Sequence, residues 1–396
     1  MLSTISTRLT NTITIIDYIS TKEFEMKILC EKEKLIKGLN SIQGVTNSKT
    51  TLPILQGILI QTNNNEVKLT TNDNELGIEY IFSCNVKEQG AIVVDSKMFS
   101  EIIRKLPDSE IKIELKNNNI LEIECLDSLY KLSTMNPEEF PELPVIEIEK
   151  SIKISDVKLK SMIKKSIIAI SLDETKPIFT GCLLEVDKNN IKLVSIDGFR
   201  LAYTNETINN NAQFKCVIPG KTLNEINKIL LEEGIDVTIG IANNQVMFLI
   251  DNCKVISRLL EGEFLNYETV IPKTKDTRIK VKTQEIIKAL ERVSLVSFSI
   301  EEKSRKFPVK FAITVGKLTL TCDGKNGNES KEELYLETEG KDLNIGFNHK
   351  YLLDALKACD DEEIYIDYGS NIAPCLIKPI ENESYLFMVL PVRLTE

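Results

Sequence analysis

The sequence predicts an α+β protein built from three copies of one domain, each with two helices packed on antiparallel sheets. Three observations support this fold class: one helix pattern occurs three times, a second helix pattern also occurs three times, and strand-like pairs separated by polar turns follow each helix. The copies begin near Met26, Ile152 and Ile279, so that one repeat spans about 126 residues, an ordinary size for a domain. We expect domains at residues 26–147, 151–272 and 278–394.

The helix in the second half of each repeat is predicted by a shared spacing of charges. Its three copies are "KMFSEIIRKL" from Lys97, "KTLNEINKIL" from Lys221 and "KYLLDALKAC" from Lys350. Each has lysine first, an acid fifth and a cation eighth, and these positions lie on one face of a helix, with the first two spaced for an ion pair. The opposite face is apolar and packs. The short runs "AIVVDS", "KCVIPG" and "NIGFNH" precede these helices as strands.

The first half of each repeat is predicted to be a strand followed by a helix. Its copies are "MKILCEKEKLIKGL", "IKISDVKLKSMIKK" and "IKVKTQEIIKAL". Hairpins with polar turns follow in "GILIQTNNNEVKLTT", "CLLEVDKNNIKLVS" and "FAITVGKLTLTC". The loop at residues 322–333, "CDGKNGNESKEE", contains two glycines, but it joins two strands and is predicted to be a surface hairpin rather than a phosphate-binding loop.

Composition indicates a protein that folds in water and resides in the cytoplasm. Hydrophobic residues make up 42% of the 396 residues and charged residues 27%, and no apolar run approaches the roughly 18 residues of a membrane span. The nine cysteines are scattered without a C-x-x-C pair, which favours reduced, mostly buried thiols over zinc ligands or disulfides. Residues 1–25 lack the features of a secretory signal and are expected to form an upstream extension of the folded protein.

The motifs of common catalytic sites are missing, so the sequence predicts no enzyme, no cofactor and no metal. Neither G-x-x-x-x-G-K-[ST] nor G-x-G-x-x-G occurs. The single histidine, His349, precedes the third "KYLLDALKAC"-type helix, where a capping or surface role is expected. The carboxylate pairs at 138–139 and 360–361 are expected to be solvated loop charges.

The final segment, "YLFMVLPVRLTE", is mostly apolar although chain ends are usually polar. It is either the last strand of a core or a surface left partly open to hold a partner.

With the repeats aligned, residues 26–394 resemble the bacterial DNA polymerase III beta subunits, the sliding clamps. Four signatures carry the resemblance: "TLPIL" at 51–55, "EEFPELP" at 138–144, "SIDGFRLA" at 195–202 and "VLPVRL" at 389–394. The resemblance implies three DNA-clamp domains per chain and a head-to-tail homodimer that closes into a ring around duplex DNA. It also implies a non-catalytic processivity factor, a subunit of the DNA polymerase III holoenzyme in DNA replication.

The net charge of −10 argues against a surface that is basic all over, but one basic face within an acidic exterior is compatible with it. By resemblance, helix cations would line the hole of the ring and meet phosphates without reading bases. The expected DNA-facing residues are Lys37, Lys49, Arg104, Lys164, Lys221, Lys228, Lys288 and Lys357.

The resemblance further implies a pocket between the second and third domains that receives short peptides of the replicative polymerase, the clamp loader and repair proteins. Phe199 and Ile196 stand where some members have His and Thr, and Thr395 and Glu396 extend beyond the Arg-Leu that often ends the chain, so the peptide preference is open. The expected pocket residues are Phe179, Ile196, Gly198, Phe199, Arg200, Leu201, Leu265, Thr269, Val270, Pro374, Met388, Val389, Leu390, Pro391, Val392, Arg393 and Leu394.

The expected dimer contact joins Tyr130 and Leu132 of the first domain to Leu295 and Val296 of the third. One alternative is a monomeric three-domain scaffold that binds proteins or an acidic ligand and never encloses DNA. An enzyme is a third alternative, but the sequence offers no nucleophile, base and orienting group for it.

Overall fold

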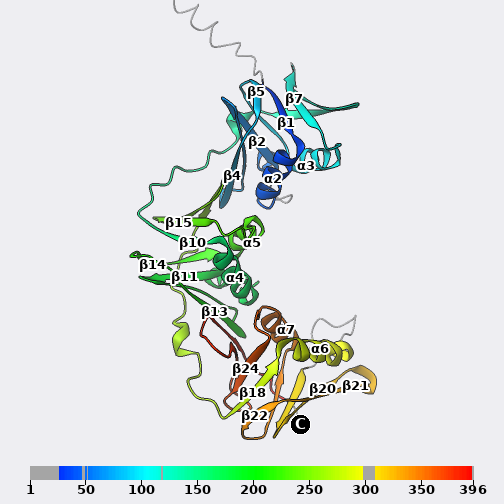
Figure 1. Ribbon diagram of the computed structural model, residues 1–396, viewed down its shortest axis with the longest axis vertical. Coiled ribbons are helices and arrows are strands. Elements are labelled where there is room, and N and C mark those ends of the chain that lie inside the picture. Colours follow the sequence, from blue (N-terminus) through cyan, green and yellow to red (C-terminus); the bar gives the residue numbers. More distant parts are fainter. Residues whose placement is uncertain (1–25, 47–49, 51, 117–118, 298–307, 395–396) are drawn as a thin grey trace, which may run out of the picture. The chain divides into compact units, whose positions relative to one another are not determined.

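The computed structural model describes residues 26–46, 50, 52–116, 119–297 and 308–394 (Figure 1). These residues form two compact units. Unit 1 holds the chain up to Val145 together with Asn252–Ile256, and unit 2 holds Ile146–Asp251 together with the chain from Ser257 onward. The expected extension at 1–25, the expected DNA-facing Lys49 and the final Thr395 and Glu396 lie outside the described residues.

Each repeat contributes the two helices that its sequence predicts. In α2, for example, Leu35, Leu39 and Ile42 are buried because their spacing places them on one face. In α3, the Asp95 carboxylate caps the helix by accepting a hydrogen bond from the Met98 N–H at 2.7 Å. The helices are α2 (Lys32–Ile42), α3 (Ser96–Lys105), α4 (Asp156–Ser166), α5 (Gly220–Ile229), α6 (Thr283–Val293) and α7 (His349–Lys357).

In the described chain the first repeat contributes nine antiparallel strands in the order β4, β3, β2, β6, β9, β8, β7, β1, β5. Alternation along β1, whose residues Met26, Ile28 and Cys30 are buried, turns one face of the strand toward the core. The strands are β1 (Met26–Glu31), β2 (Gly57–Asn63), β3 (Glu66–Asn72), β4 (Leu76–Ser83), β5 (Asn85–Glu88), β6 (Ala91–Asp95), β7 (Glu110–Lys116), β8 (Ile120–Cys125) and β9 (Ser128–Met135).

In the described chain the second repeat has four strands between its helices where the first has five, and α4 and α5 are in contact. Strand β10 pairs with β15, and β15 pairs with β16. The strands are β10 (Lys150–Ser155), β11 (Gly181–Asp187), β12 (Asn190–Ile196), β13 (Arg200–Thr207), β14 (Gln213–Pro219), β15 (Asp236–Ala242), β16 (Gln245–Ile250) and β17 (Cys253–Arg258).

In the third repeat α6 and α7 are in contact, and a four-stranded sheet has the order β21, β20, β19, β23. The stretch at 322–333 connects β20 to β21 as the predicted hairpin. The strands are β18 (Thr277–Lys282), β19 (Val309–Thr314), β20 (Lys317–Asp323), β21 (Glu329–Tyr335), β22 (Glu337–Gly340), β23 (Leu343–Phe347), β24 (Glu363–Tyr368), β25 (Cys375–Pro379) and β26 (Tyr385–Val389).

One continuous sheet joins the second and third repeats inside unit 2. Its nine strands have the order β14, β11, β12, β13, β26, β25, β24, β18, β22. The last strand of the chain, β26, lies between β13 and β25, with Arg200 opposite Val389 and Leu201 opposite Met388. This pairing places the C-terminal segment at the junction of the two repeats.

Two expectations about charged groups need correction. Asn348 caps α7 by accepting from the Lys350 N–H at 3.1 Å, whereas His349 is the first helical residue and burial lowers its pKa. Asp360 and Asp361 are not merely solvated, because Asp360 is paired with Lys165 and Asp361 accepts from the Tyr385 hydroxyl at 2.6 Å. The other pair, Glu138 and Glu139, is exposed in a 3-10 turn, Pro137–Glu139.

Within the described ranges, the longest helices have only eleven residues, and no helix meets the length and apolarity of a membrane span.

Candidate functional site

A cluster of apolar side chains lies where β13 meets β26, and it gathers many of the residues predicted for the pocket. Ile196, Leu201 and Met388 are buried in it, while Phe179 and Leu390 pack against it and remain partly open. The remaining buried members, which the sequence did not single out, are Leu183, Val194, Val217, Tyr267 and Leu376. Four of them lie on strands and Tyr267 lies in a 3-10 turn, and their burial depends on tertiary contacts that no local motif reports.

A tight turn at the start of β13 positions the polar edge of this cluster. The Asp197 carboxylate accepts from the backbone N–H groups of Phe199 at 2.9 Å and Arg200 at 3.0 Å. Gly198 has a φ of +89°, a conformation that glycine adopts without strain. The Asp-Gly pair in "SIDGFRLA" is therefore a turn signal that also sets the direction of the next two side chains.

Arg200 is engaged inside the chain. Its Nε donates to Asp197 at 2.9 Å, its Nη1 donates to Asp354 at 2.6 Å, and its guanidinium lies 4.5 Å from the centre of the Tyr351 ring. Asp354 and Tyr351 belong to α7, so Arg200 links the two repeats of unit 2. Its expected role as a direct partner of peptide polar groups is thus limited by these contacts, which the sequence did not predict.

Phe199, unlike Arg200, has a largely exposed side chain. Its side chain is 59% exposed and stacks on Tyr351, with ring centres 6.2 Å apart. Its carbonyl accepts from the Leu390 N–H at 2.9 Å, which holds the chain just beyond β26 against the turn. Tyr351 therefore belongs to this site, although no sequence motif indicated it.

The end of the described chain continues across the third repeat. The Val392 N–H donates to the Gly346 carbonyl at 2.8 Å. A Cβ at Gly346 would meet the Leu394 side chain, so Leu394 would have to shift to accept any larger residue there. Pro391 and Leu394 are half-buried, and Val392 and Arg393 are exposed. These residues leave apolar surface and one cation exposed at the end of the described chain.

The other predicted pocket residues come from three separate segments of the chain and differ in burial. Val389 belongs to the larger core of the third repeat. Leu265 and Val270 are exposed, and Thr269 ends the 3-10 turn Tyr267–Thr269. Pro374 is half-buried just before β25.

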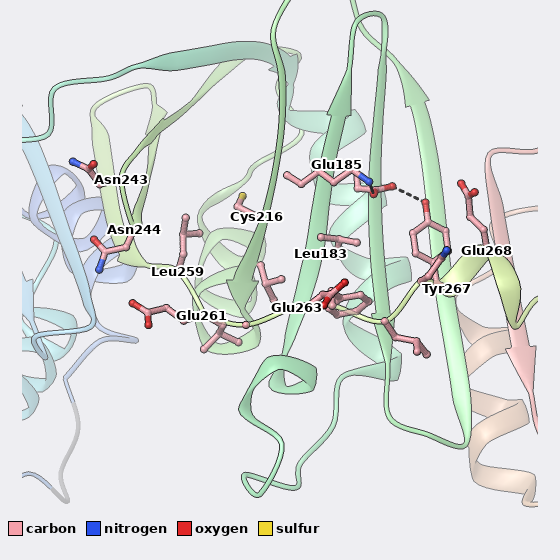
Figure 2. Close-up of a pocket in the computed structure, with 17 residues that line it drawn as sticks. Leu183, Glu185, Cys216, Asn243, Asn244, Leu259, Glu261, Glu263, Tyr267 and Glu268 are labelled. Carbon is pink, nitrogen blue, oxygen red and sulfur yellow. Dashed lines mark hydrogen bonds and ion pairs between the residues drawn. The ribbon is translucent and has the colours of Figure 1, made fainter.

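A cavity of about 650 Å³ lies beside this apolar cluster in the second repeat (Figure 2). Leu265 is the one predicted pocket residue among those that line it, and Leu183, Val217 and Tyr267 of the lining also belong to the apolar cluster. The cavity lining is Leu183, Glu185, Lys215, Cys216, Val217, Asn243, Asn244, Leu259, Leu260, Glu261, Gly262, Glu263, Phe264, Leu265, Asn266, Tyr267 and Glu268.

Glu185 is a buried carboxylate in that lining. Its Oε2 accepts from the Tyr267 hydroxyl at 2.6 Å, the contact drawn as a dashed line in Figure 2, and its Oε1 is paired with Lys215. Burial by itself would raise the pKa of Glu185, but the hydrogen bonds from Lys215 and Tyr267 bring it below the usual value. The carboxylate is therefore a satisfied anchor for the Tyr267 turn.

The seven predicted DNA-facing cations that the structure describes are all exposed and lie on helices. Arg104 of α3 donates to Asn40 of α2 at 2.8 Å, and Lys357 of α7 is paired with Glu291 of α6 at 2.6 Å. Among the acids at the fifth position, Glu225 pairs with Lys228 at 2.7 Å and Asp354 pairs with Arg200. Glu225 and Asp354 thus each have a partner besides any pairing with the lysine four residues earlier.

Lys164 and Lys357 line one cavity of about 630 Å³ between α4 and α7. Lys165 at its wall is 8% exposed and paired with Asp360. Two ion pairs, Arg200 with Asp354 and Lys165 with Asp360, therefore join the second repeat to the third.

The predicted dimer residues differ in exposure. Tyr130 and Leu295 are 40% and 66% exposed, and Val296 is half-buried. Leu132 is only 7% exposed and lies opposite Leu121 in the β8–β9 pair, so its apolar character is already explained within the chain. Among the described residues, no group of three His, Cys, Asp or Glu side chains could hold a metal ion.

Three repeats of paired helices on antiparallel sheets, with a partly open apolar cluster between the second and third, define a DNA-clamp type of protein. The DNA polymerase III beta subunit models match all three repeats: the N-terminal domain at residues 26–144, the central domain at 153–266 and the C-terminal domain at 268–393. The chain belongs to this family, the bacterial sliding clamps.

Individual relatives agree with this membership. The beta sliding clamps of Halalkalibacterium halodurans and Bacillus subtilis are 32% and 31% identical, each over 93% of this chain and 100% of the relative. A crystal structure of the Bacillus subtilis DNA polymerase sliding clamp is 30% identical, with a TM-score of 0.88 over 94% of this chain and 100% of that one. A putative DNA polymerase III beta subunit from Eubacterium rectale is 35% identical, with a TM-score of 0.86 over 93% and 100%.

Proposed function

We propose that two copies of this chain close head to tail into a ring that encircles duplex DNA and keeps the replicative polymerase on its template. The protein is a non-catalytic processivity factor of the cytoplasm, and binding to DNA is independent of sequence. The observation that carries the proposal is the threefold repetition of exposed cations on equivalent helices in a chain whose net charge is −10. Family membership favours this function over a monomeric scaffold.

The placement of the seam is part of this proposal. Tyr130 and Leu132 of the first repeat would meet Leu295 and Val296 of the third, with the boundaries of the three domains near 26–147, 151–272 and 278–394. A charge at Leu132 would disturb the first repeat itself, because that side chain is buried in the single chain. Leu295 is the better test position, since its side chain is largely exposed.

Light scattering after size exclusion tests the seam. We expect twice the mass of one chain for the unsubstituted protein and the mass of one chain for Leu295→Asp at micromolar concentration, because dimerisation would bury an unpaired charge. The matched control is Val315→Asp, also an exposed apolar position in the third repeat, which should remain dimeric. A dimer formed by Leu295→Asp would place the contact elsewhere.

The helix cations are tested on a nicked circular DNA loaded with the clamp. Retention should last until the circle is cut, and Lys164, Lys228 and Lys288 all changed to Glu should impair loading or sliding without unfolding the protein. Three exposed lysines outside the helices, Lys275, Lys331 and Lys341, changed to Glu together provide the control of equal charge. Equal retention by both triple variants would count against a lysine-lined hole.

We further propose that the cluster around Leu201 and Met388, with the open edge formed by Phe199, Val392 and Arg393, receives short peptides of the polymerase, the clamp loader and repair proteins. The apolar side chains would supply burial, and the exposed Arg393 would pair with a polar or acidic group of the peptide. Arg200 would act through the turn and α7 that it joins. A fluorescent peptide from a polymerase or clamp-loader tail provides the binding assay.

A further inference from the structure

Two cysteines meet at the beginning of the first repeat. Cys30 lies in β1, and Cys84 directly precedes β5. The antiparallel β1–β5 pair places Ile28 opposite Val86 and Leu29 opposite Asn85. The next step of the same register places Cys30 opposite Cys84.

The two thiols lie close enough for each to shift the pKa of the other. Cys84 Sγ also lies 3.2 Å from the Leu29 carbonyl oxygen, and Cys30 Sγ lies 3.4 Å from that of Glu31. Residues directly opposite in an antiparallel pair have Cα atoms about 4.5 to 5.5 Å apart, within the range that a disulfide spans. Continuing the β1–β5 register by one residue thus gives Cys30 and Cys84 a Cα separation that a disulfide can span.

The two thiols are not equivalent. Cys84 is 9% exposed and Cys30 is 2% exposed, so Cys84 is the more accessible residue of the two. The hydrogen bond from Cys30 lowers the pKa of Cys84, and the positive charge of Lys34 lowers it further. The same hydrogen bond, with burial, raises the pKa of Cys30. Cys84 has the character of an attacking thiolate and Cys30 that of its partner.

At other cysteines of the chain the surroundings disfavour the thiolate, in contrast to those of Cys84. Burial raises the pKa of Cys216, Cys359 and Cys375 to about 12, which disfavours the thiolate. Cys125, in the same repeat as the pair, is also buried, and its Sγ donates to the Pro107 carbonyl at 3.8 Å.

We propose that Cys30 and Cys84 form a redox modification site that a hydroperoxide converts to a disulfide. The Cys84 thiolate attacks the peroxide, the O–O bond breaks, and Cys84 sulfenic acid forms as hydroxide takes up a proton to leave as water. Cys30 then attacks the Cys84 sulfur, forming the S–S bond while the S–O bond breaks and a second water leaves. In total the two thiols lose two protons and two electrons, and hydrogen peroxide is reduced to two waters.

The disulfide would join β1 to the junction of β4 and β5, with α2 inside the closed loop. Because α2 carries Lys37, one of the expected DNA-facing cations, oxidation would restrain the helix at the inner surface of the proposed ring. The modification site itself does not depend on the proposed function, since it rests on the contacts of the two thiols.

The test uses the full chain, reduced and then freed of reductant. It is treated with hydrogen peroxide, alkylated with N-ethylmaleimide, digested with trypsin and mapped by mass spectrometry. We expect peptide 28–32 linked to peptide 69–87, lighter than their sum by two hydrogens and separated by dithiothreitol. Melting temperature should rise on oxidation and return on reduction.

Cys84→Ser and Cys30→Ser should abolish the linked peptide, whereas Cys125→Ser is the matched control and should retain it. Lys34→Gln should slow the peroxide reaction at neutral pH and shift its pH profile upward, with the same linked product. Oxidation of Cys216 or Cys359 while the pair stays reduced, or sulfinic acid at Cys84 without the link, would overturn the proposal. The tryptic peptide map of the unsubstituted chain tests for the Cys30–Cys84 disulfide even if a serine variant fails to fold.

Discussion

The two halves of the C-terminal segment are adjacent in the sequence but make different contacts with the rest of the chain. Residues Tyr385–Val389 form β26, which is paired on both sides, and Phe387 is 1% exposed. From Leu390 onward the chain is held by single hydrogen bonds to Phe199 and Gly346, and Val392 is 39% exposed. Both interpretations of the apolar end therefore have a place: the first half is a core strand, and the second half is available as the wall of the proposed pocket.

The difference shows that apolar character alone does not report whether a segment stabilises the fold or binds a partner. A strand paired on both edges is restrained by its whole ladder, whereas a strap with two backbone contacts retains exposed apolar surface. Substitutions in the first half should lower stability, and substitutions in the second half should lower peptide affinity.

The largest effect is expected for Phe387→Ala. Removing this buried ring should cost about 3 to 5 kcal/mol of unfolding free energy, because the surrounding core cannot fully close the cavity. Chemical denaturation followed by circular dichroism measures it. The neighbouring Leu386→Ala, at a half-buried position, is the control and should cost less. Equal losses of unfolding free energy in the two variants would contradict the expected difference between the two faces of β26.

Arg200→Ala tests the link between the repeats behind the proposed pocket. We expect a loss of about 1.5 to 3 kcal/mol of unfolding free energy, because Asp197 and Asp354 lose a charged hydrogen-bonding partner. The exposed Arg258→Ala should stay within about 0.5 kcal/mol of the unsubstituted protein. If Arg200→Ala lowered peptide affinity without any loss of stability, the arginine would be a direct peptide contact after all.

The double variant Phe199→Ala with Arg393→Ala tests the open edge. Affinity for a clamp-loader or polymerase tail peptide should fall at least tenfold, about 1.4 kcal/mol. The ring should still assemble, because neither side chain belongs to the expected seam. Fluorescence anisotropy and light scattering measure the two properties. Normal affinity combined with a clearly lower melting temperature would assign this edge to the core instead.

The smallest effect is expected for Val392→Ala. The side chain is partly exposed, so its truncation should lower stability by less than about 1 kcal/mol. Peptide affinity should decrease, but less than in the double variant, since one apolar wall residue is shortened and the aromatic ring remains. A loss of stability as large as that of Phe387→Ala would show that the strap is as much a part of the core as β26.

The elements of the fold were determined by the sequence itself. The spacing of apolar residues along α2, the alternation along β1 and the three copies of each pattern predict the helices and strands, because each depends only on residues close together in the chain. Exposure of the helix cations follows in the same way from the helical period. The family resemblance, carried by four short signatures, gave the expected pocket residues, which remain a prediction.

The tertiary structure decided which of these residues touch. The pairing of β13 with β26 buries Leu201 and Met388 together, and it brings Arg200 to Asp354, 154 residues away. Leu132 becomes a buried residue only when β8 and β9 pair. The physical reason is that the alternation of apolar and polar residues along a strand predicts which face is buried. It does not predict which distant strand pairs with that strand. The partners of Arg200, Asp360 and Cys84 depend on that choice, and local periodicity carries no information about it.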